Sequence, residues 1–200
     1  MNPKIKLVMF DAAGVIWDGG YPFTCKYLSK KYNLPYEKVL KIMQDKWFLQ
    51  ACTGKMTSLE AWERGAKELG INMGGKELED LHLGLHQVRK PLLDFADDLR
   101  KKGYICIILS NNFSKYINKF IKDFSLRKHF DEILNSQDLG FKKQDPKMFE
   151  YVFNQYGVTP EEIIYFDDQE QNLIVPKKLK INTFHFKTLK QLKMELNSQL

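Results

Sequence analysis

The sequence is poor in cysteine and has no long apolar run. Its three cysteines, Cys25, Cys52 and Cys106, lie far apart among 200 residues and form no C-x-x-C pair. This pattern argues against a disulfide framework and a structural zinc site, and it is typical of a reducing compartment. Uninterrupted apolar segments reach only about half a dozen residues, whereas a membrane-spanning helix needs about 20. We therefore expect a cytoplasmic protein with neither a signal peptide nor a membrane partner.

The chain also lacks a concentrated charge of one sign. It has 31 Lys and Arg against 25 Asp and Glu, a net charge of +6. The lysines are spread along the whole chain, and no RNA-binding aromatic signature accompanies the basic segment 177–193. This distribution is typical of a lysine-rich surface rather than of a nucleic-acid-binding arm. We expect no nucleic-acid partner, and a monomer or a homodimer.

Short apolar runs that stop abruptly at polar residues recur along the chain. Three of them are 5–10 before Asp11, 104–109 before Ser110, and 163–166 before Asp167 and Asp168. A continuous rather than alternating apolar run predicts a strand that is buried on both faces. Helical patterns lie between these runs, for example at 91–99 and 146–153. Alternation of strands and helices predicts an α/β fold with a parallel sheet.

The segment from about residue 21 to residue 88 differs from the rest, because it contains no convincing strand. Its apolar residues recur at intervals of three and four, which predicts several helices inserted after the first strand. We therefore divide the chain into a doubly wound α/β core, residues 1–17 and 89–200, and an inserted α-helical domain, residues 18–88.

Polar residues at the ends of the predicted strands are candidates for one site, because ligands of an open parallel sheet bind beyond the carboxyl ends of its strands. Carboxylates, a hydroxyl and a lysine pair would gather there: Asp11, Asp167, Asp168, Ser110, Lys142 and Lys143. Neighbouring carboxylates repel one another unless a cation lies between them, and oxygen ligands suit Mg²⁺. The lysine and the hydroxyl can hold phosphate oxygens. The pattern indicates a site for a divalent cation and a phosphate.

Four segments resemble, in order and spacing, the motifs of the haloacid dehalogenase-like (HAD) hydrolase superfamily. They are FDAAGV at 10–15, LSN at 109–111, GFKKQDP at 140–146, and YFDD at 165–168 followed by Asn172. The predicted insert is similar to the helical cap of one subclass. Within that subclass, SQDLG at 136–140 and FDD at 166–168 look most like bacterial phosphatases of α-glucose 1-phosphate. The resemblance implies a Rossmann-like core that hydrolyses a small phosphate ester.

The resemblance also implies roles for the acidic residues. Asp11 would be the nucleophile and would form an aspartyl-phosphate that water then hydrolyses. Asp11, Asp168 and the backbone carbonyl of Ala13 would hold Mg²⁺. Asp167 would bind the ion directly or through water.

The phosphoryl group would, by the same resemblance, be held by Ser110, the Asn111 amide and Lys143. Alignment with the following Asp-Pro pair favours Lys143 over Lys142 for this role. Gln144 departs from the pattern, since the family commonly has Pro after the lysine.

Ala13 is a second departure, because most phosphatases of the family have an Asp there as general acid and base. Loss of a general acid usually costs about 10²- to 10⁴-fold in rate. One alternative is a slow phosphatase that takes its proton from water or a cap residue, since the sugar-phosphate phosphatases that the chain resembles also lack this Asp and have Gly there. A second alternative is a phospho-ligand-binding protein with weak catalysis. A third alternative is a C–P bond hydrolase similar to phosphonoacetaldehyde hydrolases, which have Ala at this position and need a Schiff-base lysine, here Lys55. A dehalogenase fits least, because such enzymes do not need the metal-binding pattern.

Residues outside the motifs give weaker signals. His82 and His86 lie four residues apart on a predicted helix, which is a metal-ligand spacing. No Glu adjoins the first histidine and no third ligand is evident, which excludes a zincin site, so we expect both rings to be packed or exposed. We expect Asp18 to anchor the hinge of the insert and Trp17 to face the substrate space.

Overall fold

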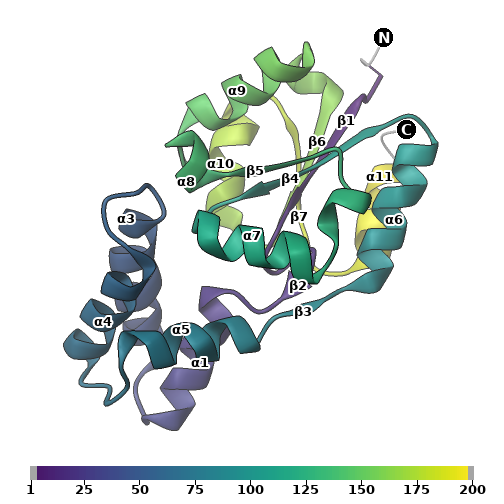
Figure 1. The fold of residues 1–200 in the computed structure, drawn as a ribbon. Coiled ribbons are helices and arrows are strands. Elements are labelled where there is room, and N and C mark those ends of the chain that lie inside the picture. Colours follow the sequence, from purple (N-terminus) through teal and green to yellow (C-terminus); the bar gives the residue numbers. More distant parts are fainter. Residues whose placement is uncertain (1–3, 198–200) are drawn as a thin grey trace.

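The computed structural model describes residues 4–197, and its centre is a five-stranded sheet with helices on both faces (Figure 1). Neighbouring strands are parallel, in the order β5-β4-β1-β6-β7. They are β1 (Leu7–Asp11), β4 (Ile105–Ser110), β5 (Glu132–Asn135), β6 (Ile163–Asp167) and β7 (Asn182–His185). The α/β fold with a parallel sheet is confirmed. Residues 1–3 and 198–200, which we assigned to the core, lie outside the described residues.

The helices around the sheet begin and end where the local sequence favours it. They are α6 (Lys90–Lys101), α7 (Ser114–Asp123), η2 (Leu126–Lys128), α8 (Ser136–Leu139), α9 (Pro146–Tyr156), η3 (Pro160–Glu162), α10 (Glu170–Lys178) and α11 (Leu189–Asn197). In α9, for example, the Asp145 side chain accepts a hydrogen bond from Lys147 N at 3.0 Å, and Pro146 takes the first helical position. The helix ends at Gly157, whose φ of 60° is the left-handed conformation that terminates helices.

The central strand β1 is apolar from Leu7 to Phe10 because it faces two hydrophobic clusters. Val8 and Phe10 pack into a cluster that α6, α7 and α11 complete, and Leu7 and Met9 pack into another with α9 and α10. Successive side chains of a strand point to opposite faces, so a strand covered on both sides needs apolar residues at every position. The uninterrupted run therefore ends only at Asp11, where the strand leaves the core.

Helices fill the segment that follows β1, as its apolar spacing predicts. They are α1 (Tyr21–Lys31), α2 (Tyr36–Leu40), the π-helical η1 (Lys41–Phe48), α3 (Leu49–Ala51), α4 (Ser58–Leu69) and α5 (Gly75–Gly84). In Figure 1 these helices, which we call the inserted helices, form a group beside the carboxyl end of β1. The chain enters and leaves the group through the two-residue strands β2 (Trp17–Asp18) and β3 (Gln87–Val88), which pair antiparallel. The sequence did not indicate this pair of strands.

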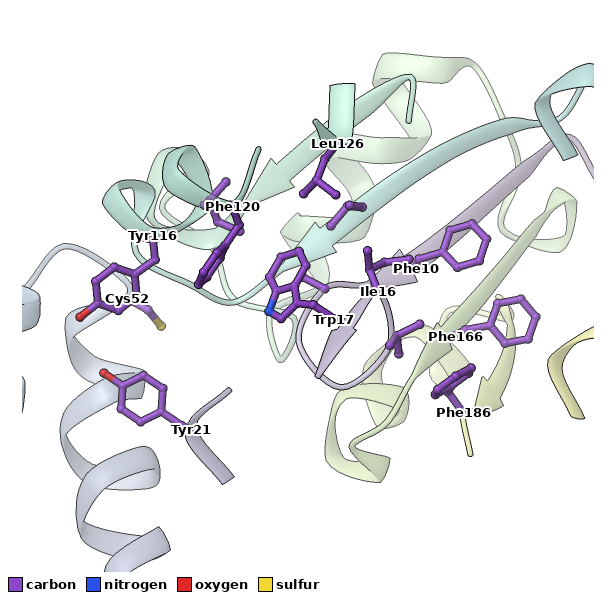
Figure 2. Packing of buried hydrophobic residues seen from close by; sticks show 14 of the residues in the cluster. Phe10, Ile16, Trp17, Tyr21, Cys52, Tyr116, Phe120, Leu126, Phe166 and Phe186 are labelled. Carbon is purple, nitrogen blue, oxygen red and sulfur yellow. The ribbon is translucent and has the colours of Figure 1, made fainter. Parts of the chain in front are cut away.

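The expectation that Trp17 faces the substrate space is wrong. Its side chain is fully buried, and its ring packs on Phe120 with the centroids 5.0 Å apart (Figure 2). The ring turns inward because pairing of Trp17 with Val88 fixes which side of β2 faces the core. The next residue, Asp18, is exposed and forms a salt bridge of 2.5 Å with Arg89. This ion pair links β2 to the residue that follows β3, the two segments through which the chain enters and leaves the inserted helices. Asp18 thus has the anchoring role expected for it.

The cysteines are buried and carry no disulfide. Burial raises the pKa of Cys25 and Cys106 to about 12 and that of Cys52 to about 11. Because the thiolate is the reactive form, these thiols are inert at neutral pH. Within residues 4–197, no helix combines the length and the apolar character needed to cross a membrane.

Candidate active site

The carboxyl ends of three neighbouring strands bring the candidate residues together. Asp11 ends β1, Ser110 ends β4 and Asp167 ends β6. From β1 the chain first builds β4 and β5 on one side of the sheet, and then returns to build β6 and β7 on the other. Ligands of such sheets bind at this reversal of strand order. Carboxylate oxygens of Asp11, Asp167 and the adjacent Asp168 lie within 4.8 Å of one another.

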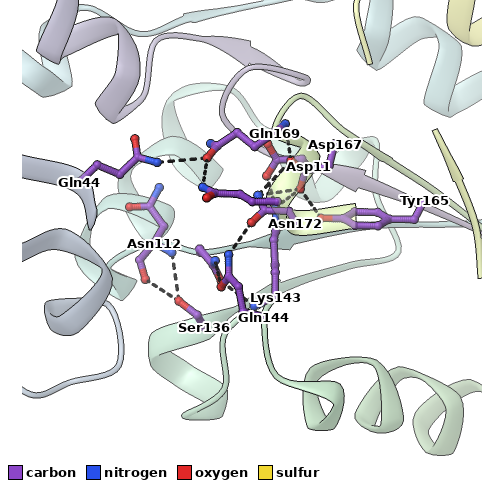
Figure 3. A network of polar contacts seen from close by, with 12 residues as sticks. Asp11, Gln44, Asn112, Ser136, Lys143, Gln144, Tyr165, Asp167, Gln169 and Asn172 are labelled. Carbon is purple, nitrogen blue, oxygen red and sulfur yellow. Dashed lines mark hydrogen bonds and ion pairs between the residues drawn. The ribbon is translucent and has the colours of Figure 1, made fainter. Parts of the chain in front are cut away.

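Lys143 is the cation of this cluster. Its ammonium donates a hydrogen bond to Asp11 Oδ1 and another, 2.8 Å long, to Asp167 Oδ2 (Figure 3). The side chain is only 1% exposed, and an ammonium that leaves water needs facing anions. Burial alone would lower the pKa of Lys143, but the charges of Asp11 and Asp167 outweigh it and raise the pKa. The amine therefore stays charged at neutral pH.

Asp167 is the most firmly held carboxylate. Its Oδ1 accepts from the backbone N–H of Gln169 at 2.9 Å and from Asn172 Nδ2 at 3.0 Å. Its Oδ2 accepts from Lys143 and from the hydroxyl of Tyr165. The sequence pattern did not predict that Tyr165 and Gln169 hold Asp167. For Tyr165 a signal existed, because it stands two residues before Asp167 on a strand and so faces the same side.

The three carboxylates together carry more negative charge than the one ammonium of Lys143 balances. Burial and the charge of Asp167 raise the pKa of Asp11 well above its usual value, against the opposing effect of Lys143. The same two causes raise the pKa of Asp168. Its Oδ1 is buried without a hydrogen-bond partner among residues 4–197. Three carboxylates therefore face one ammonium, and one carboxylate oxygen lacks a donor.

The approach of Asp168 to the loop after β1 depends on a glycine. A Cβ atom added to Gly14 would lie 2.1 Å from Asp168 Oδ2, and its φ of 95° disfavours any other residue. The glycine therefore leaves room for the carboxylate beside the loop that carries Ala13.

A chain of amides fixes the loop of Lys143. The side chain of Asn111 accepts from the backbone N–H of Lys143 at 3.0 Å and donates to Gln144 Oε1 at 3.2 Å. Gln144 in turn donates to Asn172 Oδ1 at 2.6 Å. Gln144, which replaces the usual Pro, thus links two segments that contact the carboxylate cluster. No pattern in the sequence predicts this link, because it joins residues that are far apart in the chain.

A cavity opens over the cluster, and both parts of the molecule line it. From the sheet side come Asp11, Ala13, Ser110, Asn111, Lys143 and Asp168, and from the inserted helices come Tyr21, Gln44, Phe48, Leu49 and His82. Lys142 and Lys55 are not among the lining residues. Lys55 is exposed on the bend that follows α3. The structure thus brings together the candidates proposed for the cation and the phosphate, and it leaves Lys55 outside.

Comparison with known proteins decides the family. The model of the haloacid dehalogenase-like hydrolase family matches residues 5–178. The chain belongs to this family. The fold and the order of the motifs agree with that assignment, and the resemblance found in the sequence is confirmed at this level. The closer resemblance to α-glucose-1-phosphate phosphatases stays a prediction.

Two curated relatives differ in how much of their length the chain matches. D-ribitol-5-phosphate phosphatase of Bacteroides thetaiotaomicron is 26% identical over 193 residues, which cover 90% of this chain and 91% of that protein. Bifunctional epoxide hydrolase 2 of Rattus norvegicus is 24% identical over 190 residues, 84% of this chain and 34% of that protein. The chain therefore spans about a third of the length of the epoxide hydrolase relatives that it matches.

Solved structures share the fold. A HAD family enzyme from Bacteroides thetaiotaomicron superposes with a TM-score of 0.76 at 23% identity, covering 96% of this chain and 99% of that one. The same enzyme in complex with magnesium and inorganic phosphate superposes with a TM-score of 0.71 at 22% identity, over 94% and 98% of the two chains.

Proposed function

We propose that this hydrolase is a Mg²⁺-dependent phosphatase that cleaves monoesters of small phosphorylated metabolites, with a sugar or polyol phosphate as the substrate class. The observation that carries the proposal is the cluster of three carboxylates at the ends of β1 and β6, together with the buried ammonium of Lys143 from the loop before α9. Similarity to D-ribitol-5-phosphate phosphatase and to an enzyme solved with magnesium and phosphate supports it.

The residues present fit a hard divalent cation. All three carboxylates offer oxygen ligands, and the unpartnered Oδ1 of Asp168 together with the charge around Asp11 calls for a cation. Asp11, Asp168 and the carbonyl of Ala13 would hold Mg²⁺. Asp167 would act through water, because both of its oxygens already accept hydrogen bonds. When bound, the ion supplies positive charge to the phosphate oxygens.

The chain's own residues perform the transfer. In the first step a carboxylate oxygen of Asp11 attacks phosphorus, and the bond from phosphorus to the leaving oxygen breaks. In the second step water attacks the aspartyl-phosphate and frees Asp11 and inorganic phosphate. Ser110, the backbone amide of Asn111 and the ammonium of Lys143 hold the phosphoryl oxygens, and most of the catalysis comes from positioning and charge.

The inserted helices are proposed to act as the cap. They line the cavity with Tyr21, Gln44, Phe48 and His82, and closure over a bound ester would exclude water. We propose ester hydrolysis rather than C–P bond cleavage, because Lys55 is exposed and does not line the cavity. Borohydride added with phosphonoacetaldehyde tests this choice, and covalent trapping of Lys55 would contradict it.

The test of the function is phosphate release from a panel of phosphometabolites that includes D-ribitol 5-phosphate and α-glucose 1-phosphate, with and without Mg²⁺. We expect Mg²⁺-dependent release from at least one sugar or polyol phosphate. A protein that binds these esters but releases phosphate no faster than its Asp11→Asn variant is a binding protein, and the proposed activity is then wrong.

A further inference from the structure

Two amide side chains in the cavity have a polar atom without a partner, and the proposed reaction uses neither of them. Asn112 follows Ser110 and Asn111 in the loop after β4, and Gln44 lies on η1 of the inserted helices. Both residues are 5% exposed, and both line the cavity that holds Asp11. The sheet and the inserted helices thus each place one unpaired amide in the wall of the cavity.

Backbone contacts fix the orientation of the Asn112 amide. Its Oδ1 accepts from the backbone N–H of Phe113 at 2.9 Å, and because an N–H can only donate, the other amide atom is the NH₂ group, Nδ2. The backbone N–H of Asn112 donates to Ser136 Oγ at 3.2 Å, which holds the loop in place (Figure 3). Nδ2 has no hydrogen-bond partner among residues 4–197, and protein atoms do not enclose it. A donor is thus available to a ligand in the cavity.

Only one end of the Gln44 amide has a partner. Gln44 Nε2 donates to Gln169 Oε1 at 3.1 Å, and Gln171 Nε2 donates to the same oxygen at 3.0 Å. Gln44 Oε1 is then buried without a donor in the part of the chain that the structure describes. Turning all three amides around would exchange donors and acceptors and would leave Gln44 Nε2 unpaired instead. In either arrangement one buried polar atom of Gln44 costs free energy that a ligand can recover.

Both amides lie close to the groups proposed to hold the phosphate and the cation. Asn112 directly follows Asn111. Gln44 contacts Gln169, whose backbone N–H donates to Asp167 Oδ1 at 2.9 Å. Because consecutive Cα atoms are about 3.8 Å apart, the leaving group of an ester whose phosphoryl group is held by Asn111 lies beside Asn112.

The chemistry of the unpaired atoms fits a hydroxyl group. A hydroxyl oxygen accepts from Asn112 Nδ2, and a hydroxyl pairs with either atom of Gln44 because it both donates and accepts. A carboxylate only accepts and needs a cation. Among the described residues, the one ammonium or guanidinium that lines the cavity is that of Lys143, which already pairs with Asp11 and Asp167. A leaving group with hydroxyls therefore fits better than one with a carboxylate or one with neither.

We propose, on the basis of the phosphatase function above, that Asn112 and Gln44 select esters whose leaving group carries hydroxyl groups. Asn112 Nδ2 donates to one hydroxyl oxygen, and the unpaired atom of Gln44 binds the same hydroxyl or a neighbouring one. A leaving group of similar size without hydroxyls leaves both amides unpaired, and such sites reject such analogues strongly. The two residues determine which ester is hydrolysed and take no part in the bond changes at phosphorus.

Paired esters measure this selection. The sugar or polyol phosphate that the protein hydrolyses fastest is compared with an ester of similar size that lacks hydroxyls. The analogue is n-pentyl phosphate for D-ribitol 5-phosphate and cyclohexyl phosphate for α-glucose 1-phosphate. We define the selectivity as kcat/KM for the hydroxylated ester divided by kcat/KM for its analogue. We expect a selectivity of at least about 100 in the wild type.

Substitutions of the two amides should lower the selectivity. Asn112→Leu keeps the approximate size of the side chain and removes Nδ2, so the selectivity should fall about tenfold. Gln44→Leu should lower it about threefold to tenfold. Gln137→Leu is the matched control. Gln137 Oε1 accepts from the backbone N–H of Ser114 at 2.8 Å, close to the bond that Asn112 accepts, but Gln137 does not line the cavity. The selectivity of this control should stay within about twofold of the wild type.

A purely structural defect lowers kcat/KM for both esters by the same factor and leaves the selectivity unchanged. An unchanged selectivity in Asn112→Leu, an equal fall in Gln137→Leu, or a wild-type selectivity near 1 would overturn the assignment. Faster hydrolysis of phosphoglycolate, whose leaving group carries a carboxylate, than of every sugar and polyol phosphate would overturn it too. Thermal unfolding reports whether each variant folds, and the wild type and Gln44→Leu decide the assignment if Asn112→Leu does not. If the wild type hydrolyses no ester of the panel and neither analogue, the proposed function itself fails.

Discussion

The two walls of the cavity differ in chemistry. The wall from the sheet carries three carboxylates, an ammonium and the amides that hold them. The wall from the inserted helices carries Tyr21, Gln44, Phe48, Leu49 and His82, and among the described residues no lysine or arginine of these helices lines the cavity. The charged wall therefore suits the phosphate and the cation, whereas the uncharged wall suits a neutral leaving group. Substitutions in the two walls should therefore change different kinetic parameters, and by different factors.

Loss of the Lys143 ammonium should reduce the rate of hydrolysis more than any of the changes that follow. Lys143→Met removes the cation that faces Asp11 and Asp167 and the phosphoryl oxygens, so kcat should fall about 10³-fold. Lys142→Met, on the same loop but outside the cavity, is the matched control and should stay within about twofold of the wild type. Steady-state phosphate release measures both. Similar losses in the two variants would mean that the loop, rather than the ammonium, matters.

A methyl group on the charged wall should weaken cation binding. In Gly14→Ala the new Cβ atom would lie 2.1 Å from Asp168 Oδ2, so the carboxylate must move. We expect the concentration of Mg²⁺ at half-maximal activity to rise about 10- to 100-fold. Titration of activity with Mg²⁺ measures it, and an unchanged Mg²⁺ requirement would argue against Asp168 as a ligand.

Loss of the Tyr165 hydroxyl should reduce kcat less than loss of the Lys143 ammonium, because three other donors still bind Asp167. Tyr165→Phe removes one hydrogen bond to Asp167 Oδ2 and leaves those from Lys143, Asn172 and the backbone of Gln169. One hydrogen bond to a charged group contributes about 1.5–3 kcal/mol, so kcat should fall by a factor of about 10 to 150. Mg²⁺-saturated kinetics measures it. A loss as large as that of Lys143→Met would show that Asp167 is held mainly by the tyrosine.

A variant of the uncharged wall should change KM more than kcat. Gln44, on η1, donates to Gln169 Oε1 at 3.1 Å and thereby joins the inserted helices to the loop after β6. Gln44→Ala removes a neutral hydrogen bond of about 0.5–1.5 kcal/mol, so we expect KM for the best sugar phosphate to rise about threefold to tenfold. A fall in kcat with unchanged KM would place Gln44 with the charged wall instead.

The sequence predicts the charged wall better than the uncharged one for a physical reason. Asp11, Ser110 and Asp167 each end an apolar run, and a strand that leaves the core must end in polar residues. Contacts such as that between Gln144 and Asn172 depend instead on how distant segments meet. They leave no periodic pattern in the sequence.

For the inserted helices, too, the sequence predicts less than the structure shows. Their helical spacing predicts that they exist, but it does not say which side chain faces the cavity. Trp17 was misplaced because its orientation depends on pairing with Val88, about seventy residues later in the chain. The packing of His82 against Thr24, Tyr21 and Trp62 likewise depends on how distant segments meet, and the histidine spacing alone suggests only a metal site or packing.

The most direct test of the account is phosphate release by the wild type and by Asp11→Asn, each with Mg²⁺ and with EDTA. We expect release from a sugar or polyol phosphate only by the wild type with Mg²⁺, and a loss of about 10⁴-fold or more in the variant, because the amide cannot attack phosphorus. Release by Asp11→Asn at the wild-type rate, or an equal rate in EDTA, would contradict the assignment of Asp11 as nucleophile at a metal-assisted site.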